Sequence, residues 1–121
     1  MKKILVVDDE PDINMILATY LSASGYETVS AKDGIEALEM AQTQHPDLIL
    51  LDVMMPELSG FQVARLLKED TATQAIPIVM LTAKTQQSDR FWGIESGAAA
   101  YLHKPFELSV VLDQVRSLLG D

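Results

Sequence analysis

Carboxylates stand directly after two apolar runs of this chain, at positions where they could share a metal ion. Asp8 and Asp9 follow Ile4–Val7, and Asp52 follows Leu48–Leu51. Runs of this length predict buried strands, and ligands of open parallel sheets bind beyond the carboxyl ends of the strands. Three carboxylates in one small site repel each other unless a cation compensates. The pattern therefore favours a hard divalent cation with oxygen ligands.

Two further polar groups end strand-like runs in the same way. Thr82 follows Pro77–Leu81, and Lys104 follows Ala100–His103. The loop after the first run has no glycine and carries Pro11, so it does not resemble a nucleotide-phosphate loop. Mg²⁺ fits better, because it uses one or two carboxylates, keeps several waters and commonly serves phosphoryl chemistry.

Ordinary structural interpretations compete with this one. Asp8, Asp9 or Glu10 could cap a helix that begins near Pro11, so capping and metal binding both remain open for the first two. Asp52 is more informative because it is a carboxylate inside an apolar stretch, where an unpaired charge is unfavourable. It is expected to have a partner or a function. A single threonine or lysine at a strand end would carry no signal by itself.

These residues must be positioned by short strands that alternate with helices. Strands are predicted at Ile4–Val7, Tyr26–Ser30, Leu48–Leu51, Pro77–Leu81 and Ala100–His103. Helices are predicted from Pro11 to about Gly25, from Asp33 or Gly34 to the break at His45-Pro46, at Phe61–Glu69, at about Asp89–Ser96 and at Glu107–Leu119.

Continuous apolar strands between helices indicate a parallel sheet with both faces covered. The predicted fold class is therefore α/β: a flavodoxin-like, doubly wound, five-stranded parallel sheet in the order 2-1-3-4-5 with five helices. Residues 1–121 are expected to form one domain. A fragment of a larger Rossmann-type domain is the alternative architecture.

Amino-acid composition disfavours several classes of binding partner and functional site. The 121 residues carry a net charge of −9, which disfavours nucleic acid and anionic membranes as direct partners. The absence of cysteine excludes disulfides, thiolate metal sites and cysteine nucleophiles. No run is long enough for a signal peptide or a membrane span, so the expected location is cytoplasmic. His45 and His103 are assigned to a loop and a strand-end surface, without a role.

Five motifs, in this order and spacing, resemble the receiver domain of two-component response regulators over essentially the whole chain. They are Val6-Val7-Asp8-Asp9-Glu10, Leu50-Leu51-Asp52-Val53-Met54-Met55-Pro56, Gly60, Leu81-Thr82-Ala83 and Tyr101-Leu102-His103-Lys104-Pro105-Phe106.

The resemblance implies that Asp52 is the phosphoacceptor, taking a phosphoryl group from a phosphohistidine of a partner kinase. It implies Mg²⁺ held directly by Asp9, largely through water by Asp8, and also by Asp52 and the backbone carbonyl of Met54. The expected function is a phosphorylation-activated signalling switch that catalyses only its own phosphorylation and dephosphorylation, and is not a turnover enzyme.

The same resemblance implies that Thr82 and Lys104 contact the phosphoryl oxygens, that the Lys104–Pro105 bond is cis, and that Thr82 and Tyr101 form a switch pair. The output surface would combine the fourth helix, fifth strand and fifth helix. Trp92 and Glu95 are candidate residues of that partner surface. A sensor histidine kinase or phosphotransfer protein and a downstream effector protein are the expected partners, with a monomer or a phosphorylation-dependent dimer.

Other functions are weighed against the switch. A small phosphatase with an aspartate nucleophile is the enzyme alternative, but Met54 stands where such a site would place a second acid. A flavin mononucleotide carrier is opposed by the acidic first loop. The chain could also be a receiver excised from a longer regulator; a single-domain, chemotaxis-like or motility-like regulator is preferred.

Overall fold

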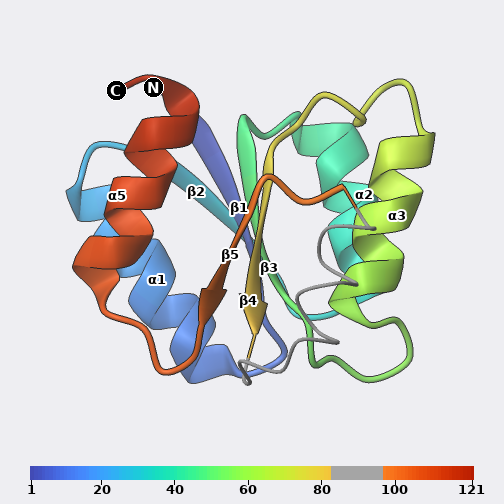
Figure 1. Cartoon of the computed structure of the whole chain (residues 1–121), viewed down its shortest axis with the longest axis horizontal. Helices are drawn as coiled ribbons and strands as arrows, with labels where there is room; N and C mark the ends of the chain where they lie inside the picture. Colours follow the sequence, from blue (N-terminus) through green and yellow to red (C-terminus); the bar gives the residue numbers. More distant parts are fainter. Residues whose placement is uncertain (83–96) are drawn as a thin grey trace.

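A parallel β-sheet runs through the middle of the molecule, and helices cover both of its faces (Figure 1). The computed structural model describes residues 1–82 and 97–121. Its strands are β1 (Lys3–Val7), β2 (Glu27–Ala31), β3 (Leu48–Asp52), β4 (Ile78–Thr82) and β5 (Ala100–His103). The helices in these ranges are α1 (Pro11–Ala23), α2 (Gly34–Gln44), α3 (Gly60–Glu69) and α5 (Leu108–Leu119).

The strands pair in parallel in the order β2-β1-β3-β4-β5. This confirms the predicted sheet and its order, and the described helices lie close to their predicted positions. The helix predicted at about Asp89–Ser96 falls outside the described residues, so the fifth helix stays a prediction. None of the described helices is both long and apolar enough to cross a bilayer.

Two apolar layers hold the helices against the sheet. In one layer α1 and α5 pack on one face, and in the other α2 and α3 pack on the opposite face (Figure 1). Ile4–Val7, Leu48–Leu51 and Ile78–Leu81 are wholly inaccessible to solvent. Burial on both faces explains why these strands read as continuous apolar runs rather than alternating ones.

Local capping fixes where two of the helices begin. The Asp33 carboxylate accepts a hydrogen bond from the amide of Glu36 at 2.8 Å. Ser59 and Gln62 form a reciprocal capping box at the start of α3. The next residue, Gly60, lies so close to β3 that an added Cβ would stand 2.3 Å from the carbonyl oxygen of Asp52. Glycine at this position therefore lets the β3–α3 loop fold back over the end of β3.

Candidate functional site

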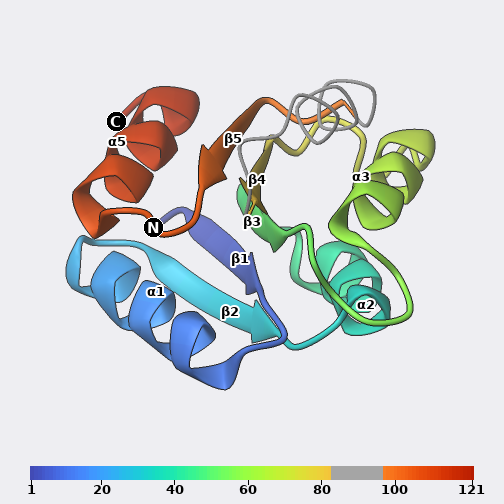
Figure 2. The same cartoon turned by 60° about the horizontal axis from the view of Figure 1, so that its bottom comes forward.

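The polar residues singled out in the sequence stand at or just beyond the carboxyl ends of the strands. Figure 2 turns this edge of the sheet, which is at the bottom of Figure 1, towards the viewer. Asp8 follows β1, Asp52 ends β3, Thr82 ends β4 and Lys104 follows β5. Because β1 and β3 are neighbours and connect to helices on opposite faces, their ends flank the point where ligands bind in open α/β sheets. Topology thus brings together residues that are far apart in the sequence.

Lys104 joins the two buried carboxylates. Its Nζ lies 2.9 Å from Oδ2 of Asp8 and 3.3 Å from Oδ1 of Asp52. Asp8 is fully buried, Asp52 is 2% exposed, and the Lys104 side chain is 16% exposed. One ammonium therefore serves two carboxylates in a largely water-excluded site, which leaves a negative balance that a further cation can neutralise.

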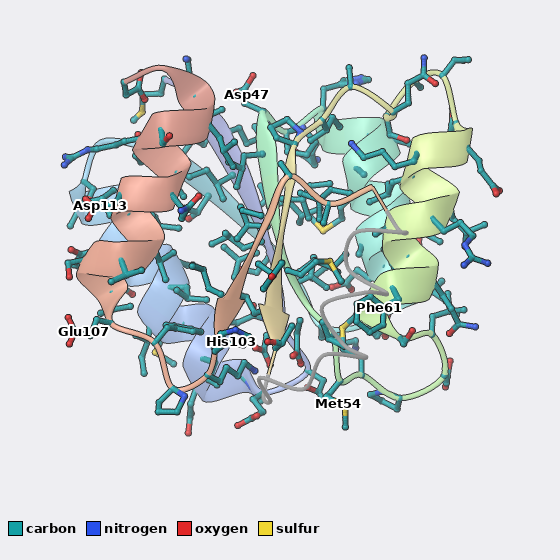
Figure 3. All side chains as sticks on the ribbon, viewed as in Figure 1. Asp47, Met54, Phe61, His103, Glu107 and Asp113 are labelled. Carbon is teal, nitrogen blue, oxygen red and sulfur yellow. The ribbon has the colours of Figure 1, made fainter. Side chains whose placement is uncertain are left out.

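The β3–α3 loop fixes the second carboxylate. The amide of Met54 donates to Oδ1 of Asp52 at 3.3 Å. The amide of Gly60 donates to the carbonyl oxygen of Val53 at 2.9 Å and holds the loop closed. The Met54 side chain is 65% exposed, and Figure 3 shows it at the same edge as His103. The loop therefore orients the Asp52 carboxylate and places the exposed Met54 thioether, a flexible side chain, beside it.

Asp8, Asp9 and Glu10 form an acidic cluster whose carboxylate oxygens lie within 4.8 Å of one another. Asp8 is buried, whereas Asp9 and Glu10 are exposed. Glu10 occupies the N-cap position of α1 without a side-chain hydrogen bond to the helix, and the Asp8 carboxylate accepts from the Glu10 amide at 2.9 Å. The helix-capping alternative thus loses its support. The all-oxygen donor set fits a hard cation such as Mg²⁺.

Burial and neighbouring charges shift the pKa values of two residues in this site. It raises the pKa of Asp52 to about 7, and the negative charge of Asp8 adds to the rise, while Lys104 and the Met54 amide oppose it. Burial by itself lowers the pKa of Lys104, but the hydrogen bond to Asp8 and the charge of Asp52 outweigh it, so that this pKa is raised. Lys104 is therefore a permanent cation, and Asp52 is a carboxylate whose charge is held at an energetic cost.

That cost predicts a pH-dependent gain in stability for Asp52→Asn. The folded-state pKa, about 7, exceeds the ordinary value of 3.8, so the buried charge destabilises the fold above pH 7. This penalty grows as the pH rises from about 4 to 7 and disappears only well below pH 4, where the proton is bound in both states. In metal-free buffer the variant should be more stable than the parent by about 4 kcal/mol at pH 8.5, where the parent carboxyl is ionised in both states.

Urea unfolding with a chelator, at pH 8.5 and pH 5, measures the effect. The exposed Asp113 on α5 supplies the matched control, since Asp113→Asn should change stability little at either pH. An advantage of Asp52→Asn that stays the same at both pH values would contradict the buried-charge interpretation.

Thr82 and Tyr101, the predicted switch pair, lie on adjacent strands. Thr82 is 3% exposed and is the register partner of His103, while Tyr101 pairs with Met80. Oγ1 of Thr82 lies 2.9 Å from Nδ1 of His103. The rings of Tyr101 and His103 meet edge to face with centroids 5.6 Å apart. His103, which the sequence analysis assigned to the surface without a role, thus contacts both members of the pair.

The structure tests only some of the remaining predictions for the site. The Lys104–Pro105 peptide bond is cis. Trp92 and Glu95, the predicted partner surface, lie outside the described residues. The roles assigned to individual site residues, including the Met54 carbonyl as a metal ligand, stay predictions.

Asn14 was missed by the sequence analysis. Its Nδ2 donates to the carbonyl oxygens of Asp8 at 2.7 Å and Ala31 at 3.0 Å, which ties the acidic loop to the end of β2. A signal was available: Asn14 precedes Leu17 by three residues and Leu21 by seven, and so stands on the apolar stripe of α1. A polar residue in that stripe indicates a side chain that hydrogen-bonds to partly buried backbone groups.

Comparison with known proteins agrees with this geometry. A family model described as the response regulator receiver domain matches residues 4–116. The probable transcriptional regulator ycf27 of Cyanophora paradoxa is 51% identical over 118 residues, which are 98% of this chain and 48% of that protein. Protein PilH of Pseudomonas aeruginosa is 37% identical over 120 residues, 99% of each chain. This chain therefore spans about half the length of some curated relatives and nearly all of others.

A solved structure resembles the fold closely. The receiver domain of sensor histidine kinase PA1611 from Pseudomonas aeruginosa has a TM-score of 0.91 and 31% identity, covering 99% of this chain and 98% of that one. That structure is described with a magnesium ion coordinated in its active-site cleft.

Proposed function

This chain belongs to the family of response regulator receiver domains, which are phosphorylation-activated signalling switches, and we propose that Asp52 is its phosphoacceptor. The donor is a phosphohistidine of a sensor histidine kinase or phosphotransfer protein. The observation that carries the proposal is the ammonium of Lys104, shared between two buried carboxylates at the carboxyl edge of the sheet. Such an arrangement provides a fixed nucleophile beside a fixed positive charge.

In the reaction, a carboxylate oxygen of Asp52 forms a bond to phosphorus as the bond from phosphorus to the histidine nitrogen breaks. The departing imidazole keeps the electron pair of that bond. A carboxylate is a weak nucleophile, so the rate depends on positioning and on neutralising the phosphoryl oxygens. Lys104 supplies part of that neutralisation, and the Met54 amide orients Asp52. The product is an acyl phosphate, which water can hydrolyse.

Asp8, Asp9 and Asp52, with the carbonyl of Met54, would hold Mg²⁺ at this site. The clustered acidic oxygens of the first loop support this assignment, and the related PA1611 receiver is described with magnesium. When bound, Mg²⁺ would neutralise charge on the carboxylates and on the incoming phosphoryl oxygens. Glu10 lies in the same acidic cluster and adds to its negative potential.

The proposed function includes an effector surface, a limited catalytic role and a cellular location. The phosphorylated form controls a downstream effector protein through the surface of the fourth helix, β5 and α5. The chain catalyses changes only in its own phosphorylation and does not turn over phosphate esters, and it acts in the cytoplasm. The phosphatase alternative has no observation in its favour.

Incubation with acetyl phosphate tests the proposal. Intact mass spectrometry should show one added phosphoryl group when Mg²⁺ is present and essentially none when a chelator replaces it, because the acidic site is too negative to accept the phosphate dianion without a cation. Hydroxylamine should remove the added group, since an acyl phosphate is susceptible to this nucleophile. Absence of any addition, or addition that does not depend on Mg²⁺, would overturn the proposal.

A further inference from the structure

His103 occupies an unusual place between the two switch residues. It is the last residue of β5, directly opposite Thr82 in the parallel register, and two residues beyond Tyr101 on the same face of the strand. Its Nδ1 lies 2.9 Å from the Thr82 hydroxyl oxygen, and its ring meets the Tyr101 ring edge to face at an interplanar angle of 66°. An imidazole therefore contacts both the hydroxyl and the aromatic ring.

The hydroxyl of Thr82 faces β5. Besides the contact to His103, the oxygen lies 3.5 Å from the carbonyl oxygen of Leu102, at the limit of a hydrogen bond. The 2.9 Å contact to Nδ1 is shorter and stronger than the contact to Leu102. When the imidazole carries its proton on Nε2, Nδ1 accepts the single hydrogen that the hydroxyl can donate.

We infer that His103 is a positioning residue of the switch, which holds the Thr82 hydroxyl against β5 until a phosphoryl group draws the hydroxyl away. The inference rests on the proposed function, in which Thr82 donates to a phosphoryl oxygen. Because a threonine hydroxyl has one hydrogen, His103 and the phosphoryl group compete for the same donor. His103 therefore favours the unphosphorylated arrangement.

Release of Thr82 also changes the surroundings of Tyr101. Once the hydroxyl leaves Nδ1, the imidazole loses a hydrogen-bond partner while its edge-to-face contact with Tyr101 remains available. A rotated imidazole that gives Nδ1 a new hydrogen-bond partner is then favoured. Because the Tyr101 ring packs against the imidazole, this rotation changes the position of the tyrosine ring. In this chain the coupling between Thr82 and Tyr101 runs through the His103 ring, which biases a two-state element.

Two substitutions of nearly equal shape test the competition. His103→Leu removes the acceptor, whereas His103→Asn retains a side-chain oxygen at a comparable distance from the backbone. The probe is fluoroberyllate, a phosphoryl mimic, titrated with Mg²⁺ and followed by fluorine-19 NMR. His103→Leu should raise its affinity about three- to ten-fold, the range expected from one hydrogen bond. His103→Asn should return the affinity towards that of the parent.

A double-mutant cycle isolates the contact. In a Thr82→Val background, His103→Leu should leave the affinity for fluoroberyllate unchanged, because the shared hydroxyl is absent. A merely structural role for His103 would instead lower the affinity in both variants and in both backgrounds. Unchanged affinity in His103→Leu, or the same gain with and without the Thr82 hydroxyl, would overturn the inference.

Nitrogen-15 NMR of the imidazole gives an independent measurement. In the parent protein without the mimic, Nδ1 should be the unprotonated, hydrogen-bonded nitrogen, and its shift should change when fluoroberyllate and Mg²⁺ are added. A proton on Nδ1 would overturn the inference while leaving the proposed function intact. Failure of the parent protein to take up either acetyl phosphate or fluoroberyllate would instead overturn the proposed function, and this inference with it.

Discussion

Asp52→Asn should abolish the Mg²⁺-dependent uptake of phosphate from acetyl phosphate. The amide oxygen of asparagine is a far poorer nucleophile than a carboxylate, so we expect the rate to fall more than about 100-fold. Asparagine keeps the shape of the side chain and an oxygen that can accept from the Met54 amide, and the hydrogen bond from Gly60 to Val53 that closes the loop joins backbone groups. The loss should therefore reflect chemistry rather than misfolding, which the expected gain in stability at high pH would demonstrate in the same protein sample.

Intact mass spectrometry over a time course measures the effect, with Asp113→Asn as the control. Asp113 is exposed on α5 and lies on the outer side of that helix (Figure 3), so its variant should be phosphorylated like the parent. A phosphorylated Asp52→Asn protein would show that another group, such as Asp8 or Asp9, is the acceptor, and would exclude the mechanism proposed for this site.

Lys104→Met should weaken both the fold and the reaction. Removing the ammonium leaves Asp8 and Asp52 buried without their shared cation, and breaking such a pair destabilises proteins by about 3 kcal/mol or more. The loss of positive charge beside the phosphoryl oxygens should slow phosphorylation by roughly 10- to 100-fold. Because Lys104 opposes the rise in the pKa of Asp52, its removal should raise that pKa further.

The pH dependence separates the two causes of the slower reaction. If protonation of Asp52 contributes, raising the pH from 7 to 9 should restore part of the rate of Lys104→Met, because the higher pH ionises the carboxyl group. Lys32→Met is the control, since Lys32 is an exposed lysine just beyond β2 at the same edge of the sheet. A Lys104→Met protein that is as stable as the parent and is phosphorylated within two-fold of its rate would contradict the role proposed for this residue.

Much of the fold was predictable because its signals are local. Runs such as Leu48–Leu51 are apolar at every position, which only a strand buried on both faces requires. Asp33 and Ser59 precede helices and cap them through their own side chains. The strand order also followed, since right-handed crossovers and a five-strand pattern leave few alternatives. Predictions for the span 83–96 remain untested because it lies outside the described residues.

The neighbourhood of the site residues was predictable only in part. That Asp52, Thr82 and Lys104 stand at the carboxyl edge follows from each one being next to a strand end. Their partners do not follow from position alone. Lys104 approaches Asp8 more closely than Asp52, and Glu10 joins the acidic cluster although its place before Pro11 predicts a helix cap.

What the sequence determined by itself is the inventory and order of the reactive groups: an acidic pair after the first strand, a carboxylate after the third and a lysine after the fifth. These depend on periodicity and polarity, which act between neighbours in the chain. Only the tertiary structure decided that Asn14 ties the acidic loop down and that His103 meets Thr82. Such contacts depend on the register between strands and on side-chain directions, because hydrogen bonds are lost over fractions of an ångström and no local pattern encodes them.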